Sequence, residues 1–400
     1  MSLKVLYSII LALLPVIMIY RVPGSHFGVG TLSILLLAVA SLIVILKNRY
    51  VKLNCLLFLF LTYLIARNIG DGFTPVLYTL SFLIVIACYN GHLDFELVAK
   101  TIETISIIAS MAVLIQTIMH YIFGINIAFL YSPTLLSEYA SATGYSLKSG
   151  LFRPSAFFLE PAHFCQYTII ALFTLLEKRD TSTNKIISIC LVTAGILCTT
   201  SGIGILLCIG IYAYYLGRII LQKKGINKLL YFVVLGVFAI LVLLIASRIP
   251  LIQNTWQRVF GNDVGEYNAV RGRSVHWEDT VGSLQGMQAL WGVGPKNNRI
   301  AGFITGANEI IYYYGYFGLG LLVLSLIALI FKSTKEDIDS MKWTIILCGI
   351  YFALFWASDI VGFISIAFWF SVLVCDKSTY IEKKWRYCNE NLDDSNIFST

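Results

Sequence analysis

Long runs of apolar residues follow one another along this chain, separated by shorter polar segments. A helix that crosses the hydrocarbon core of a bilayer needs about 20 apolar residues, and fewer where it begins inside the protein. Because backbone groups cannot remain unpaired in lipid, these runs predict an all-α polytopic membrane protein. We expect about twelve transmembrane helices, at residues 5–20, 27–46, 53–66, 75–90, 102–123, 161–176, 186–199, 202–221, 229–247, 308–331, 343–357 and 359–375.

The composition and the placement of charge agree with a membrane protein. Apolar residues make up 58% of the 400 residues and charged residues 13%, whereas soluble chains carry about 25% charged residues. With a cytoplasmic N-terminus, 19 of the 29 Lys and Arg residues fall on the cytoplasmic side. The positive-inside rule therefore predicts that both termini are cytoplasmic. The net charge of +7 reflects this orientation, and no nucleic-acid partner is expected.

This topology predicts a single helical transmembrane domain over residues 1–375 and a cytoplasmic tail over 376–400. Two long loops, 124–160 and 248–307, would lie outside the cytoplasm and hold eight of the ten outer basic residues. Loops of this length in a compact protein are usually functional or disordered. The second loop contains three tryptophans, which argues against disorder. We therefore expect the loops to carry the function.

The first candidate site is the segment Arg153–Pro161 at the end of the first long loop. Proline favours the first position of a helix, so Glu160 is predicted to cap the sixth span, with Arg153 as the partner of its carboxylate. That structural interpretation competes with a functional one. Glu160, His163 and Tyr167 fall at helical spacing on one face, which indicates a polar, wet cavity at the outer end of the helix.

The second candidate site is a group of four arginines in the second long loop, Arg248, Arg258, Arg271 and Arg273. Each guanidinium is planar, always charged, and matches two phosphate oxygens at once, so together they could bind a diphosphate without a metal. The alternative is a solvated basic loop. Arg273 lies between Gly272 and nearby Trp277, which favours the functional interpretation for this arginine.

The third candidate site opens the tenth span, where Asn308, Tyr312 and Gly315 are predicted to share a helical face. Tyrosines at a membrane interface are usually anchors, but an asparagine there is not explained in that way. In the fifth span, Gln116 and His120 are either a buried pair or part of the same cavity.

Other chemistries lack support in the sequence. The five histidines show no metal-ligand spacing, so neither a metal nor another cofactor is expected. The glycines of Gly292-Val293-Gly294 lack the strand and helix that accompany a phosphate-binding loop. No ATP-binding motif is found, so the energy for a reaction would have to come with the substrate.

Three of these motifs together resemble a known family. The segment 153–161 resembles the Arg-x-x-x-aromatic-aromatic-x-Glu-Pro signature of Wzy-type O-antigen and exopolysaccharide polymerases. Gly272-Arg273 with Trp277, followed by Gly292-Val293-Gly294-Pro295, is similar to the second signature of that superfamily. Asn308 before an aromatic span resembles the third, although Ala307 stands where relatives often have histidine.

The resemblance implies an inverting, metal-independent glycosyltransferase of the GT-C type in the bacterial cytoplasmic (inner) membrane. Its partners would be an oligosaccharide repeat on undecaprenyl diphosphate, membrane lipid and a regulator of chain length. It also implies that Arg153 and Arg273 stabilise the leaving diphosphate and that Glu160 is the general base. The other expected substrate-binding residues are Arg248, Arg258, Arg271, His163, Tyr167, Trp277, Asn308 and Tyr312.

Two alternatives remain open. An O-antigen ligase belongs to the same superfamily, but histidine is prominent in the ligase pattern and Ala307 takes its place here. A lipid-linked oligosaccharide flippase, or another secondary transporter, belongs to a different class. Transporters place polar residues near the bilayer midplane, often on broken helices, whereas the predicted midplane of this chain is apolar and its long loops are external.

Overall fold

The computed structural model describes residues 2–47, 51–148, 151–178, 182–222, 253, 277–278, 280–295, 305–334, 338–358, 360–378 and 380. This part of the chain is mostly helical, as predicted. The α-helices are α1 Leu3–Ile17, α2 Val29–Lys47, α3 Cys55–Arg67, α4 Thr74–Tyr89, α5 Phe95–Phe123, α6 Pro161–Glu177, α7 Thr183–Cys198, α8 Gly202–Gln222, α12 Met287–Trp291, α13 Gly306–Thr334, α14 Ile338–Ala357 and α15 Phe363–Val374.

Each predicted span that falls on described residues coincides with one of these helices. The ninth span, 229–247, lies outside the described residues. Five helices, α2, α5, α8, α13 and α14, are long and apolar enough to cross a membrane. The chain therefore has the character of an all-α membrane protein, and the count of twelve crossings stays a prediction.

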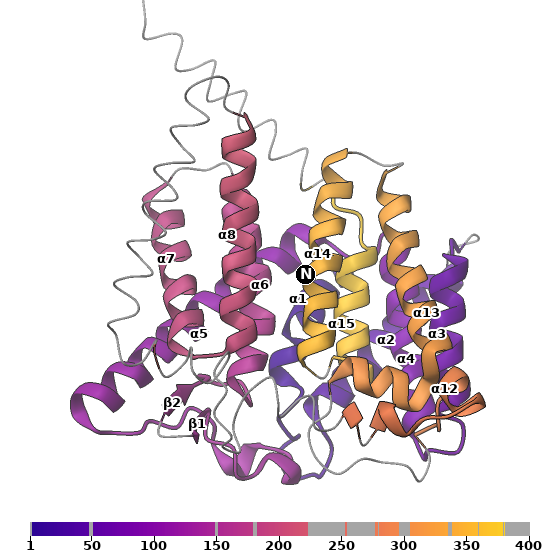
Figure 1. Ribbon diagram of the computed structural model, residues 1–400, viewed down its shortest axis with the longest axis horizontal. Helices are drawn as coiled ribbons and strands as arrows, with labels where there is room; N and C mark the ends of the chain where they lie inside the picture. The colour runs from indigo at the N-terminus through magenta and orange to yellow at the C-terminus, as the bar shows by residue number, and fades with distance from the viewer. Residues whose placement is uncertain are drawn as a thin grey trace, which may run out of the picture.

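The helices form a bundle in which α6 is enclosed (Figure 1). Figure 1 shows α5, α7 and α8 around α6 on one side and α2, α3, α4 and α13 on the other, with α1, α14 and α15 between. Nearly every residue of α6 is buried, from Pro161 at its start to Glu177 at its end. A helix that is apolar all round needs such a central position.

Helix α5 begins earlier than predicted. Its predicted start was residue 102, but the helix begins at Phe95. The side chain of Asp94 accepts a hydrogen bond from the backbone N–H of Leu97 at 3.2 Å and so caps the first turn. At the other end Gly124 has a left-handed backbone with φ 67°, which ends the helix. These polar caps extend α5 beyond the apolar run.

The first long loop contains secondary structure that the apolar pattern did not predict. Strands β1 Tyr145–Lys148 and β2 Leu151–Pro154 form an antiparallel hairpin, and two short 3₁₀ turns, η1 Ser132–Thr134 and η2 Ser137–Tyr139, precede it. The third such turn, η3 Val281–Ser283, lies before α12. In Figure 1 the hairpin and α12 lie at the same end of the bundle.

Helix α13 is broken at Gly315, where φ is 71° and ψ is 178°. The continuous span predicted over 308–331 is therefore two helical parts, Gly306 to Tyr314 and Tyr316 to Thr334, and Figure 1 shows the change of direction beside α12. The prediction that Gly315 shares a helical face with Asn308 and Tyr312 is wrong, because its backbone is not helical.

Candidate functional site

Arg153 lies in β2, opposite Ser146 of β1, and only 9% of its surface is exposed. Arg153 lies near Cys165, one turn into α6. The thiol of Cys165 contacts the hydroxyl of Thr199 at 3.3 Å, in the tight turn between α7 and α8. The hairpin thus brings Arg153 near the first turns of α6.

Glu160 is the residue before α6, as predicted, but its side chain makes no capping hydrogen bond. Among the described residues it also makes no ion pair with Arg153, so the interpretation of Glu160 as a capped partner of Arg153 is wrong. Glutamate is not among the residues that cap well, because its longer side chain does not return easily to the N2 and N3 amides. Glu160 is instead exposed at the N-terminal end of α6.

Gln116 of α5 holds the Arg153–Pro161 segment in position. Its Nε2 donates to the carbonyl oxygens of Ile127 at 2.9 Å and Gly144 at 3.1 Å. Its Oε1 accepts from the backbone N–H of Ala156 at 3.0 Å. Ala156 has a left-handed backbone with φ 53°, which is uncommon for a residue other than glycine. The amide of Gln116 therefore stabilises a strained turn three residues after Arg153.

His120 does not pair with Gln116, so the first of the two alternatives, a buried pair, is wrong. Its Nδ1 lies 2.7 Å from Oδ1 of Asn126. Its ring stacks on Phe152 with centroids 4.1 Å apart and planes 11° from parallel. Gln116 and His120 thus both bind the first long loop, each through its own partners.

The predicted pair His163 and Tyr167 lines one pocket beside the first turns of α6, with a volume of about 40 Å³. The hydroxyl of Tyr167 donates to the carbonyl oxygen of Ala12 in α1 at 2.9 Å, so it also ties α6 to α1. Glu160 is not part of the pocket lining. Gln166 does line the pocket. The sequence-based prediction missed it, although it lies three residues after His163 and therefore on the same helical face.

The glycine-rich segment before α13 packs backbone to backbone against the break in that helix. The N–H groups of Val293 and Gly294 donate to the carbonyl oxygens of Tyr312 at 2.8 Å and Tyr313 at 3.0 Å. A Cβ atom at Gly292 would lie 2.4 Å from the carbonyl carbon of Tyr313. These glycines allow the close approach, and the two amides are used within the protein rather than for phosphate.

Three residues near the end of α3 complete this junction, and the sequence did not single them out for it. Arg67 Nη2 donates to the carbonyl oxygen of Gly292 at 2.9 Å. The Tyr63 hydroxyl donates to the carbonyl oxygen of Tyr314 at 2.8 Å, and Asn68 Nδ2 donates to the Tyr314 hydroxyl at 2.7 Å. The feature of the sequence that could have pointed to this junction was Arg67, a basic residue in a short predicted outer loop.

Asn308 is 3% exposed, and its Nδ2 has no hydrogen-bond partner among the described residues. Its backbone N–H donates to the hydroxyl of Thr305 at 3.3 Å, which supports the first turn of α13. Tyr312, one turn later, is partly exposed and packs edge to face against Tyr313. Asn308 thus presents a buried amide donor that water or a ligand would have to satisfy.

The remaining predicted site residues are only partly tested. Trp277 is described, and its ring stacks on Trp356 at the end of α14, with centroids 6.1 Å apart. The lining of the α6 pocket includes none of Trp277, Asn308 and Tyr312. The four arginines of the second loop, Arg248, Arg258, Arg271 and Arg273, lie outside the described residues. In the part of the chain that is described, no three metal-ligating side chains come together.

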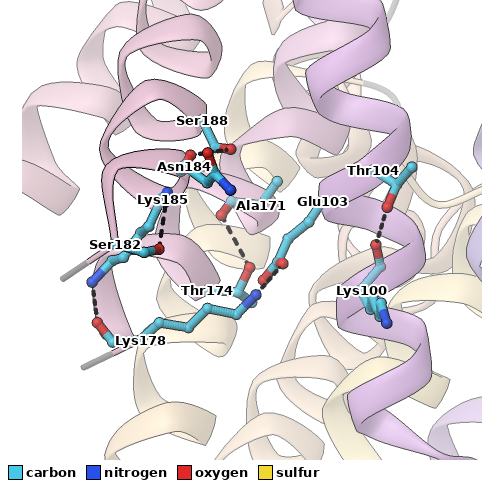
Figure 2. A network of polar contacts seen from close by, with 10 residues as sticks. All are labelled: Lys100, Glu103, Thr104, Ala171, Thr174, Lys178, Ser182, Asn184, Lys185 and Ser188. Carbon is cyan, nitrogen blue, oxygen red and sulfur yellow. Dashed lines mark hydrogen bonds and ion pairs between the residues drawn. The ribbon is translucent and has the colours of Figure 1, made fainter. Parts of the chain in front are cut away.

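A separate polar network lies at the far end of α6 (Figure 2). Figure 2 shows Glu103 of α5 extending to Lys178, which follows α6, and these two form an ion pair. Beside it, Arg218 of α8 binds both carboxylate oxygens of Glu177, at 2.7 and 2.8 Å. Burial raises the pKa of Tyr380, which packs near this network, and the charge of Glu103 raises it further. Because its charges are paired, this network serves to hold helices together.

Comparison of the chain with models of protein families and with curated proteins gives no match. The resemblance to polymerases therefore rests on the motifs of the sequence.

Proposed function

We propose that this chain is a polysaccharide polymerase that joins oligosaccharide repeats carried on undecaprenyl diphosphate. The observation that carries the proposal is the arrangement at the start of α6. A buried arginine, Arg153, and an exposed carboxylate, Glu160, flank the turn at Ala156 that leads into α6, and the first turns of α6 line a small pocket. A glycosyl transfer with a diphosphate leaving group requires positive charge to stabilise that group and a general base to accept a proton. Arg153 and Glu160 would supply both near the N-terminal end of α6.

The proposed reaction is an inverting glycosyl transfer. A hydroxyl oxygen of the incoming repeat attacks the anomeric carbon of the growing chain, and the bond from that carbon to the diphosphate oxygen breaks. The hydroxyl proton passes to Glu160, and the electron pair leaves with undecaprenyl diphosphate. Arg153, together with Arg273 and its neighbouring arginines, stabilises the charge on the leaving group, and we propose that no metal is needed.

The proposed setting is a bacterial cytoplasmic membrane with twelve crossings and both termini in the cytoplasm. Two features support it: the described parts of both long loops lie at the same end of the bundle (Figure 1), and 19 of 29 basic residues fall on the other side of the predicted topology. Partners would be the lipid-linked repeat, membrane lipid and a regulator of chain length.

A transporter is the candidate of another class, and the break in α13 is the observation that favours it, since transporters often bind substrate at broken helices. The groups freed by this break are occupied, however. The carbonyl oxygens of Tyr312, Tyr313 and Tyr314 accept hydrogen bonds from Val293, Gly294 and Tyr63. The break therefore serves packing in this state, and the polymerase remains the better supported proposal.

Deletion of the gene, followed by analysis of the surface glycan, tests the proposal. Loss of a polymerase leaves single repeats still attached to their final acceptor. Loss of a ligase leaves lipid-linked polymer that never reaches the acceptor, and loss of a flippase traps repeats in the cytoplasm. Unchanged polymer length in the deletion strain would refute all three functions.

A further inference from the structure

The pocket beside α6 has no Lys, Arg, Asp or Glu in its lining, which separates it from a typical phosphate site. It lies between three helices that are distant in sequence, α1, α6 and α15. Its lining is apolar and aromatic with a few polar groups, the usual composition of a small-molecule site. The lining residues are Pro15, Met18, His163, Gln166, Tyr167, Ile364, Ser365, Phe368 and Trp369.

Gln166 gives the pocket an unused hydrogen-bond donor. The side chain is 9% exposed, and its Nε2 has no partner among the described residues. A buried amide nitrogen needs an acceptor, because water has been removed from it without replacement. The pocket is about 40 Å³, and one water requires about 10–15 Å³ of such space. A few waters, or the hydroxyl-bearing edge of one sugar ring, would satisfy the amide.

The chemistry of the lining favours a sugar over the other parts of the proposed substrate. A diphosphate would lose its hydration here without meeting a lysine or an arginine, which is costly. A sugar is neutral and has hydroxyls that accept from Gln166 and bond to Ser365. Its C–H face can pack on aromatic rings such as Trp369. The lipid tail has no hydroxyl for the amide.

We infer that this pocket binds the edge of the acceptor sugar of the incoming repeat, with Gln166 donating to one of its oxygens. The inference rests on the proposed function and assigns the acceptor to a place apart from the arginines. Glu160 immediately precedes the helix that carries Gln166, six residues earlier, an axial separation of about 9 Å. The acceptor repeat would have to span this distance between the pocket and the exposed carboxylate.

The test uses the full-length protein, purified in nanodiscs, and two separate probes. One is the free oligosaccharide repeat released from the source organism's surface glycan, and the other is undecaprenyl diphosphate. Gln166→Leu removes the donor and keeps much of the volume. We expect it to weaken oligosaccharide binding about five- to tenfold, the worth of one hydrogen bond, with undecaprenyl diphosphate binding unchanged. The KM for lipid-linked acceptor should rise by a similar factor.

Thr168→Val is the matched control, because its hydroxyl bonds only to the carbonyl oxygen of Phe164 within α6. It should leave the binding of both probes unchanged. If Gln166→Leu does not accumulate, Ser365→Leu fills the pocket from α15 and should cause the same selective loss. Normal oligosaccharide binding by either pocket variant would overturn the inference and leave the polymerase proposal standing. A wild-type protein that binds the oligosaccharide at the pocket without polymerising lipid-linked repeats would support the pocket and refute the polymerase.

Discussion

The backbone N–H of Val293 donates to the carbonyl oxygen of Tyr312 at 2.8 Å. This bond joins two segments that the sequence singled out separately, the glycine-rich motif before α13 and the tyrosine-rich start of α13 itself. It exists because Gly315 interrupts the helix and frees that carbonyl from its intrahelical partner. The two motifs are therefore one structural unit, and a change in either should disturb the other.

The first prediction concerns Gly315. Its φ of 71° and ψ of 178° are almost exclusive to glycine, and a Cβ atom there would lie 2.1 Å from the carbonyl oxygen of Leu290. We expect Gly315→Ala to destabilise the protein by about 2 kcal/mol or more, seen as a lower Tm in detergent and lower membrane levels. Gly320→Ala, on the same helix with nothing within 4 Å, should be neutral. Equal Tm values for the two variants would contradict the observed break.

The second prediction concerns Glu160, whose carboxylate is exposed and makes no capping bond. Glu160→Gln should accumulate normally and melt at the wild-type temperature, yet make no polymer, because the amide cannot accept the proton. Arg153→Ala should instead lower the amount of folded protein, since Arg153 is 9% exposed within the hairpin. Polymer from Glu160→Gln at near wild-type length would show that another group is the base.

The third prediction concerns Gln116, which makes three hydrogen bonds to the segment that carries Arg153. Gln116→Leu should cost about 2–3 kcal/mol in the free energy of unfolding, since each lost bond contributes about 1 kcal/mol. Activity should fall further than stability explains, because the turn at Ala156 loses its support. Thr101→Val is the comparison: its hydroxyl donates to the carbonyl oxygen of Leu97 within α5. A loss no larger than that of Thr101→Val would argue against this role.

The fourth prediction concerns the ion pair between Glu177 and Arg218, whose side chains are 7% and 34% exposed. A double-mutant cycle with Glu177→Gln and Arg218→Met should give a coupling of about 1–2 kcal/mol in thermal stability. The exposed pair Asp339 and Lys342, at 31% and 51%, should give less than about 0.5 kcal/mol. Similar couplings for the two pairs would mean that the buried network is not stabilising.

The fifth prediction concerns topology. Met287 of α12 and Leu221 of α8 are 69% and 71% exposed and belong to opposite ends of the proposed topology. A cysteine at 287 should react with a membrane-impermeant maleimide added to intact cells, and a cysteine at 221 should react only after permeabilisation. The unsubstituted chain, with its native cysteines, gives the baseline. Labelling of residue 221 from outside would invert the proposed orientation.

Helix positions were predictable from the sequence because apolar run length is a local property, and α2 and α8 match their predicted spans closely. The hairpin β1–β2 was not predictable, because its strands are short and the residue before β1, Gly144, is held by a hydrogen bond from Gln116 of α5. The break in α13 depends on the approach of Leu290 and Gly292, which no local pattern contains.

The candidate site was predictable to a similar extent. Helical spacing brought His163 and Tyr167 to one pocket, and the same spacing contains Gln166, which was overlooked. Glu160 was placed correctly in the chain but wrongly paired, because capping depends on side-chain reach and rotamer rather than position. In the sequence Arg67 is one basic residue in a short predicted outer loop, and only the fold shows that it binds the carbonyl oxygen of Gly292.

The break at Gly315 also changes which part of α13 must be inside a bilayer. From Tyr316 to Thr334 the helix measures about 28 Å at 1.5 Å per residue, close to the thickness of about 30 Å of a hydrocarbon core. The preceding part, with the buried Asn308 and the partly exposed Tyr312, is then not required for crossing. The lipid-linked substrate of the proposed function has its own boundary between tail and glycan, and we expect Tyr312 to lie near the depth of that boundary.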